Sequence, residues 1–284
     1  CLGECHGLPA GRVLLAARAS EFIHRSTALA AKEGAVQDAG PPHSYGDYAQ
    51  AAEVRGREVL RGGGAAAGLQ WACEPSSPLG LTDPALHAWR QGDVDAAWRV
   101  LDCAYVPLRL DLEGTWTGAP SPRMPSACWQ LWTPNKALGL TGVRAAYAIA
   151  PQGGEAEAAA LVALTPSWPV GAHGVALLQA WVQPSVQHWL ADCLPVLRDW
   201  KARQVALCGA LGWEVLSGSQ ANYFCARPPV GALFELLRHL RAQGVKLRDC
   251  ASFGLPGVLR LGVLAPESQD ALHQAWERFS AVAA

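Results

Sequence analysis

The sequence lacks the features that mark membrane, secreted and nucleic-acid-binding proteins. No apolar run approaches the length that a bilayer-spanning helix needs, and no early segment has the layout of a signal peptide. Acidic and basic residues nearly cancel, 24 against 23, so no excess of positive charge would attract nucleic acid. We therefore predict a soluble protein that binds neither a membrane nor nucleic acid.

The sequence also lacks the cysteine patterns of metal sites and disulfide frameworks. Its nine cysteines are an odd number, and none belongs to a Cys-x-x-Cys pair. Cys73 and Cys103 lie in apolar, strand-like stretches, which indicates buried, reduced thiols in a cytoplasmic protein. Cys1, Cys5 and His6 have no fourth ligand nearby, so we predict no metal site.

The first half of the chain alternates between strand-like and helical stretches. Strands are predicted at 12–16, 68–73, 98–103, 129–132 and 143–149, and an amphipathic helix at 20–32 with Ser20 as its cap. This alternation favours an α/β fold with a mostly parallel central sheet and helices on both faces. In such sheets ligands bind beyond the C-terminal ends of the strands.

The pattern changes after Pro151. Helices are predicted at 153–164, 186–211, 230–243 and 267–281, and short strands at 214–216, 223–226 and 258–263. We therefore predict a large domain over 1–165 and a smaller α+β domain over 166–284. The Gly- and Ala-rich segment 61–68 is expected to form a flexible surface loop, and the chain shows no internal repeat.

The segment from Leu131 to Arg144 carries the strongest chemical signal. Lys136 follows Thr133 by three positions and precedes Arg144 by eight, with glycines between them. A hydroxyl and an arginine suit a bound phosphate, and a lysine beside them can form an imine with an aldehyde. Pyridoxal phosphate (PLP) carries both groups. The same residue types also occur together on ordinary exposed loops.

A second signal is an acid at the end of an apolar strand. Burying Asp102 costs free energy unless a positive or hydrogen-bonding group meets its carboxylate. A pyridine nitrogen kept protonated by this aspartate would meet it and would act as an electron sink. Tyr105, three residues later, could reach the phenolic oxygen of the same ring. The alternative is a strand-end aspartate that caps a loop.

Taken in order, these motifs resemble those of the class I and II aminotransferases, which depend on PLP and have fold type I. Thr133-x-x-Lys136 with its Gly-rich turn and Arg144 matches one family motif, and Asp102-x-Ala-Tyr105 matches another. The resemblance covers nearly the whole chain from about Arg12. It implies the fold type I architecture and catalytic roles for Lys136, Asp102 and Tyr105.

The resemblance also implies a set of cofactor contacts. Backbone and hydroxyl groups at the start of the helix after the first strand would hold the phosphate, and an aromatic ring would stack on the pyridine. The residues are Ala19, Ser20, Tyr45, Ser77, Asp102, Tyr105, Thr133, Lys136 and Arg144. Considered alone, Tyr45 could instead be a core residue, and the Pro-Ser-Ser-Pro around Ser77 could be a plain loop.

Two of these positions depart from the family pattern. Arg18 stands where the family usually has glycine, so it needs either a different turn or a direct role on the phosphate. Ser77 stands where an asparagine normally donates to the phenolic oxygen. A serine can donate the same hydrogen bond, but its side chain is shorter, so we expect the cofactor to be bound more weakly.

The C-terminal motifs look most like those of histidinol-phosphate aminotransferases and of the threonine-phosphate decarboxylases of cobalamin synthesis. Arg260, in an apolar strand, would bind a substrate carboxylate through two bonds. The resemblance implies that Arg248 meets a phosphate on the substrate. Asn222 has a family counterpart near the substrate end.

We therefore expect an aminotransferase that acts on an amino acid or amino-acid phosphate together with a keto acid. Decarboxylation stays open, because the bond that breaks depends on which α-carbon bond stands perpendicular to the ring. A catalytically weak PLP-binding homologue also stays open, motivated by Arg18 and Ser77. The family implies a homodimer, and the N-terminal arm of the family is expected to be missing or truncated, since the chain begins with Cys1.

Overall fold

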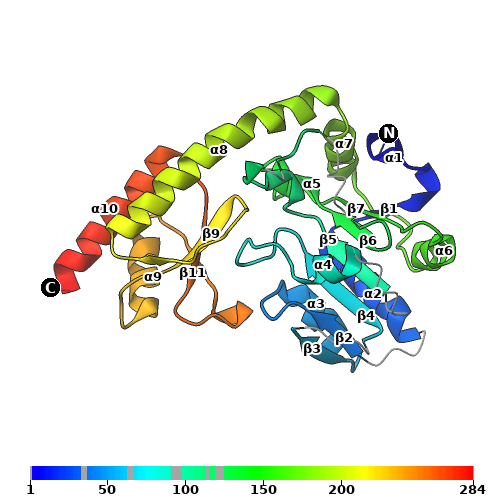
Figure 1. Ribbon diagram of the computed structural model, residues 1–284, viewed down its shortest axis with the longest axis horizontal. Helices are drawn as coiled ribbons and strands as arrows, with labels where there is room; N and C mark the ends of the chain where they lie inside the picture. Colours follow the sequence, from blue (N-terminus) through cyan, green and yellow to red (C-terminus); the bar gives the residue numbers. More distant parts are fainter. Residues whose placement is uncertain are drawn as a thin grey trace.

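The computed structural model describes residues 2–32, 37–62, 67–90, 98–112, 115–118 and 125–283. It has a large domain built on one sheet and a small domain built on another, and the long helix α8 (Pro184–Ala210) runs along both of them (Figure 1). In the part of the chain that the structure describes, no helix has both the length and the apolarity to span a bilayer.

Seven strands form the large sheet among the described residues, in the order β1-β7-β6-β5-β4-β2-β3. Only β7 runs against its neighbours β1 and β6, and the pairs from β6 to β3 are parallel. The strands are β1 (Val13–Ala16), β2 (Gln37–Gly40), β3 (Glu58–Arg61), β4 (Leu69–Cys73), β5 (Trp98–Asp102), β6 (Trp129–Trp132) and β7 (Ala146–Ile149). The predicted α/β fold with a mostly parallel sheet is confirmed.

Strand boundaries follow the prediction closely in four cases and miss in three. Strand β7 begins at Ala146 rather than at 143, because the short helix α5 (Pro134–Ala137) and the turn after it occupy more of the chain than expected. Strands β2 and β3 were not predicted. The sequence of β2, Gln-Asp-Ala-Gly, has little β-propensity, so pairing with its neighbours decides its conformation. Residues 63–66 of the predicted surface loop lie outside the described residues.

Helices cover both faces of the large sheet, as predicted. Alternate strand residues point to opposite faces, so Trp71 belongs to one core and Ala72 to the other. One face is covered by α2 (Ala19–Lys32), α3 (Gly46–Glu53) and α6 (Glu155–Ala163). The other is covered by α4 (Ala85–Arg90), α7 (Ala172–Trp181) and the first half of α8. Helix α7 was not predicted, and α2 begins at Ala19, so Ser20 lies in its first turn rather than at its cap.

The small domain is an antiparallel sheet with helices packed against it. Its strands have the order β10-β11-β9-β8. They are β8 (Glu214–Val215), β9 (Tyr223–Arg227), β10 (Arg248–Asp249) and β11 (Leu259–Gly262), and α9 (Leu233–Ala242) and α10 (Pro266–Ala283) complete the domain. Leu194 of α8 packs in the large-domain core, whereas Cys208 packs in the small-domain core. Helix α8 thus contributes side chains to the cores of both domains.

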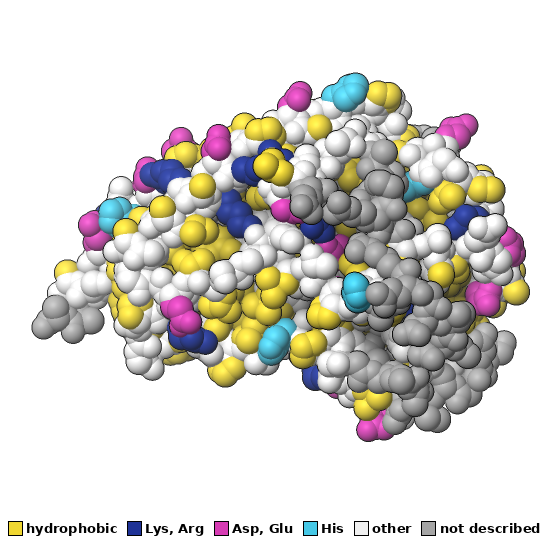
Figure 2. All heavy atoms as spheres, in the orientation of Figure 1, with side chains coloured by type: hydrophobic (Ala, Val, Ile, Leu, Met, Phe, Trp, Pro, Cys, Tyr) yellow, Lys and Arg dark blue, Asp and Glu magenta, His cyan; other side chains and the backbone are white. Residues whose placement is uncertain are grey.

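Short segments complete the chain, and surface charges are mixed. The first helix is α1 (Leu2–Cys5), and single 3-10 turns lie at Ala10–Arg12, Val106–Leu108 and Ala251–Phe253. Acidic and basic side chains are interspersed on the face shown in Figure 2. Among the described cysteines, Cys73 and Cys103 are buried and free, as predicted.

A buried hydrogen-bond chain holds the N-terminal segment against the large domain. The Nε2 atom of His6 lies 2.7 Å from the hydroxyl of Tyr147, which also accepts a bond from Trp181 Nε1 at 3.1 Å. Since the hydroxyl oxygen accepts from Trp181, its proton can go to His6, and this requires an uncharged imidazole nitrogen. Burial lowers the pKa of His6 to about 4, which matches that role.

This chain of bonds predicts a loss of stability in acid. Folded His6 binds fewer protons than the unfolded chain between its folded pKa of about 4 and the unfolded value of 6.5, so the free energy of unfolding should fall as the pH falls through this window. The full effect is on the order of 3 kcal/mol. His6→Gln, which does not titrate, should flatten the dependence in urea unfolding between about pH 7 and about pH 5. The exposed His188→Gln should keep it, and equal slopes in the wild type and His6→Gln would contradict the assignment.

Candidate active site

The sequence-predicted residues lie at one edge of the large sheet. In the register, Cys73 of β4 faces Asp102 of β5, and Asp102 faces Leu131 of β6, so these three strands end together. Strand β7 runs the other way, and its first residue, Ala146, pairs with the last residue of β1, Ala16. The segments after β1, β4, β5 and β6 and the segment before β7 therefore meet at this edge.

Asp102 is buried there and fully engaged. One carboxylate oxygen accepts the backbone N–H of Ala104 at 2.9 Å, and the other accepts the hydroxyl of Tyr48 at 2.7 Å. Burial, followed by the charge of Asp102, raises the pKa of Tyr48 well above its usual value, so the hydroxyl stays a donor. The ring of Tyr48 stacks on Trp71 with centroids 4.6 Å apart. Sequence analysis missed Tyr48, although its place among the buried alanines of α3 was a signal.

Lys136 lies on the single turn of α5 directly after β6. The turn is fixed by Asn135, whose side-chain amide donates to the carbonyl of Val143 at 3.1 Å. The ε-amine of Lys136 sits 4.2 Å from the centre of the Tyr105 ring. Burial by itself would lower the pKa of Lys136, but Tyr105 and Asp102 outweigh it and the net pKa is raised.

One cavity joins these groups. It measures about 440 Å³, and its walls include Tyr45, Ser77, Asp102, Tyr105, Lys136 and Arg260. The hydroxyl of Tyr45 lies 3.4 Å from Ser20 Oγ, which brings the start of α2 next to this wall. The structure thus brings five predicted cofactor residues and two predicted substrate residues, Arg248 and Arg260, to a single space. In the described part of the chain, no group of three or more His, Cys, Asp or Glu side chains could hold a metal ion.

The residues predicted to hold the phosphate lie beyond this cavity but at the same sheet edge. Ala19 and Ser20 follow β1, Thr133 follows β6, and the exposed Arg144 precedes β7. Thr133 is buried, and among the described residues its hydroxyl oxygen has no hydrogen-bond partner. Within the same range no residue other than glycine has a positive φ, so the turn at Arg18 accommodates a side chain without strain.

The turn after β4 connects the two domains. Ser77 Oγ accepts a bond from Arg260 Nη1 of the small domain at 3.0 Å, and the hydroxyl of Tyr223 donates to the carbonyl of Ser76 at 2.8 Å. Gly80 has a φ of +74°, and a Cβ added there would lie 2.3 Å from Ser219 Oγ, so only glycine fits. Ser77 is therefore tied to the predicted carboxylate-binding arginine.

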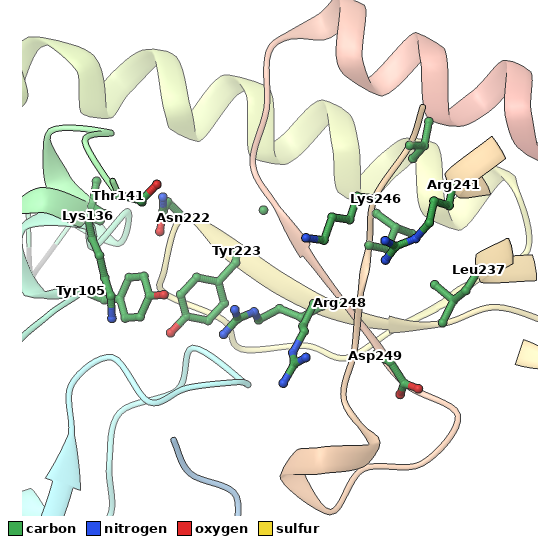
Figure 3. A pocket seen from close by; sticks show the side chains of 15 residues that line it. Tyr105, Lys136, Thr141, Asn222, Tyr223, Leu237, Arg241, Lys246, Arg248 and Asp249 are labelled. Atoms are coloured by element: carbon green, nitrogen blue, oxygen red, sulfur yellow. The ribbon is translucent and has the colours of Figure 1, made fainter. Parts of the chain in front are cut away.

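A second cavity of about 510 Å³ shares Tyr105, Lys136, Arg248 and Arg260 with the first. Arg248 and Arg260 are direct partners across β10 and β11, so both can face it. Figure 3 shows Lys136 and Tyr105 at one end, with Tyr223 and Arg248 next along the wall. Asn222 also lines this cavity, and its amide oxygen is buried with no partner in the described residues. All three predicted substrate residues therefore line one space.

Comparison with known proteins agrees with this geometry. The family model for aminotransferase class I and II matches residues 131–279, which is more than half of the chain. The chain belongs to this family. Histidinol-phosphate aminotransferase from Jannaschia is 26% identical over 288 residues, covering 95% of this chain and 77% of that protein. The predicted family is confirmed, and with it a transferase activity.

Solved structures show the same fold. A putative histidinol-phosphate aminotransferase from Erwinia carotovora has a TM-score of 0.79 at 19% identity, covering 99% of this chain and 85% of the other. L-threonine-O-3-phosphate decarboxylase from Porphyromonas gingivalis has a TM-score of 0.77 at 20% identity, covering 98% and 86%. A decarboxylase from Sulfurospirillum multivorans reaches 0.82 at 16% identity, covering 98% and 84%. Fold type I is thereby confirmed.

The contact between Tyr48 and Asp102 predicts a measurable cost when it is removed. Tyr48→Phe keeps the stacking on Trp71 but takes one donor from a buried carboxylate, so the free energy of unfolding should fall by about 1–3 kcal/mol. Tyr45→Phe is the matched control, because Tyr45 is an exposed side chain whose hydroxyl contacts Ser20 and Asp47, and its loss should change stability by less than about 0.5 kcal/mol. Urea unfolding without added cofactor measures both, and similar losses in the two variants would argue against a structural role for the Tyr48 bond.

Proposed function

We propose that this aminotransferase uses PLP and acts on an amino acid or an amino-acid phosphate, with a keto acid as its second substrate. The observation that carries the proposal is the shared cavity of Lys136, Asp102 and Arg260. It offers an amine for an aldehyde, a carboxylate for a ring nitrogen and a guanidinium for a substrate carboxylate within one space.

The residues present fit this cofactor. Thr133 has a buried hydroxyl oxygen without a partner among the described residues, which a phosphate at the sheet edge would satisfy. Ala19 and Ser20 of α2 and Arg144 before β7 complete the proposed phosphate site. Tyr45 would stack on the ring. When bound, PLP would supply an aldehyde that reacts with amines and a ring that withdraws electrons from the substrate α-carbon.

Each catalytic side chain has a distinct task in this proposal. Lys136 holds the aldehyde and, once its amine is free, moves a proton at the substrate α-carbon. Asp102, itself fixed by Tyr48 and Ala104, holds a proton on the ring nitrogen. Tyr105 donates to the phenolic oxygen. Ser77 accepts from Arg260, so its own proton is free to reach the same oxygen.

The small domain would orient the substrate. Arg260 stacks on Tyr223 and Phe253, with its guanidinium carbon 5.1 Å and 5.7 Å from the ring centres, and this fixes its plane for a carboxylate. Arg248 would meet a phosphate on the substrate, and Asn222 would present its unpartnered amide oxygen to a donor. The arrangement decides which α-carbon bond is aligned with the ring system.

The proposed role of Lys136 predicts a spectroscopic change. Wild-type protein mixed with PLP should turn yellow, and borohydride should fix the label to the chain. Lys136→Ala should give no fixed label. Lys136→Arg, which keeps the positive charge without the reactive amine, should also give none. A colourless wild type that ignores the cofactor would instead favour a non-catalytic homologue.

The choice between transamination and decarboxylation predicts a product difference. We expect amino transfer from L-histidinol phosphate or O-phospho-L-threonine only when a keto acid is present, because the amino group must leave on an acceptor. Measurements of carbon dioxide and of glutamate, made with and without 2-oxoglutarate, test this. Carbon dioxide released from O-phospho-L-threonine without a keto acid would establish the decarboxylase, the reaction that a place in cobalamin biosynthesis would require.

The assembly and the compartment are proposals of the same kind. We propose a homodimer, since family sites lie at a subunit interface, and sedimentation would measure it. We also propose a cytoplasmic location. The eight cysteines in the described residues are all free, as a reducing compartment would keep them.

A further inference from the structure

The cavity of about 510 Å³ continues beyond the residues that the proposed function uses. Figure 3 shows Arg241 and Leu237 at the end opposite Lys136 and Tyr105, with Lys246 reaching into the same space. Arg241 comes from the last turn of α9, and Lys246 from the connection to β10. The ring of the cofactor would take the neighbouring space of about 440 Å³. The far end is therefore left for the substrate.

The positive charges at this end have no protein counterpart. Among the described residues, neither the Arg241 guanidinium nor the Lys246 ammonium has a hydrogen-bond or ion-pair partner. Arg248 reaches Ser252 rather than a carboxylate. Asp249 is the one acid among the described lining residues, and its carboxylate accepts the N–H of Ala251.

The positive charges lie at two places along the cavity, which we call the first and the second station. Arg248 and Arg260 pair across β10 and β11 and lie next to Tyr223. Arg241 lies at the end farthest from Lys136, beside Leu237, and the amine of Lys246 lies between Arg241 and the Lys136 end. An alkyl chain along Leu237 with an anion at its end matches this order of apolar and cationic groups. A guanidinium together with an ammonium suits a doubly charged phosphate or phosphonate.

We propose that Arg241 and Lys246 form a second anion-binding subsite, which takes the terminal phosphate of an amino acid too long for Arg248 to serve. This rests on the proposed function for the direction of the substrate, with its α-carboxylate at Arg260. The enzyme would then hold short phosphorylated amino acids at the first station and long ones at the second. Leu237 would contact the end of the substrate chain that carries the phosphate.

Amino acids with a terminal phosphonate on chains of different length can test the subsite. The probes are 2-amino-3-phosphonopropionate, 2-amino-5-phosphonopentanoate and 2-amino-7-phosphonoheptanoate, and isothermal titration calorimetry measures their Kd at low salt. The double variant Arg241→Gln/Lys246→Gln should weaken binding of the longest probe about tenfold and of the shortest less than about twofold. Arg248→Gln should have the opposite preference.

The matched control is Arg238→Gln on the same helix. Arg238 pairs with Glu235 and does not line the cavity, so its loss lowers the net charge without touching the subsite. It should leave all three Kd values within about twofold. Equal losses for all chain lengths in the double variant, or no loss for the longest probe, would overturn the proposal.

The titrations are made with and without PLP, so that the two proposals can fail separately. A protein that never turns yellow but shows the length-dependent loss keeps the subsite and loses the proposed cofactor chemistry. A yellow protein whose double variant binds every probe like the wild type keeps the cofactor chemistry and loses the subsite.

Discussion

Burial of the Asp102 carboxylate at the end of β5 is the constraint on which the rest of the site depends. A carboxylate at the end of a central strand costs free energy to bury without partners. Here the backbone N–H of Ala104 and the hydroxyl of Tyr48 each donate a hydrogen bond to it. Tyr48 in turn is held in place because its ring stacks on Trp71 and because its helix, α3, packs in the core on one face of the sheet. The position of α3, which connects β2 to the edge strand β3, is thus tied to the charge at the middle of the sheet.

The same charge explains the state of Lys136. Burial disfavours its ammonium, whereas Tyr105 and Asp102 favour it, and the second effect is larger. The lysine is therefore a cation in the folded protein. A cavity with a fixed anion on one wall and a cation on the other suits a ligand that carries complementary groups at separate positions.

The two domains contribute different side chains to the cavities of the site. The large domain supplies the groups for chemistry, because its parallel strands end together. The small domain supplies a wall of arginine and lysine side chains. Contacts such as Tyr223 to Ser76 and Arg260 to Ser77 fix one against the other, and α8 packs in both cores.

The sequence by itself determined the family and the α/β architecture, and it placed Asp102 and the Thr133–Lys136 turn at one sheet edge, because both follow apolar strands whose ends must meet in a parallel sheet. It did not reveal β2 and β3, whose short polar segments become strands only through pairing. Tertiary structure alone decided that Tyr48 meets Asp102, that Ser77 is tied to Arg260, and that Arg241 and Lys246 line the same cavity as Lys136. Those contacts join segments far apart in the chain, and their geometry depends on how helices and domains pack rather than on any local pattern.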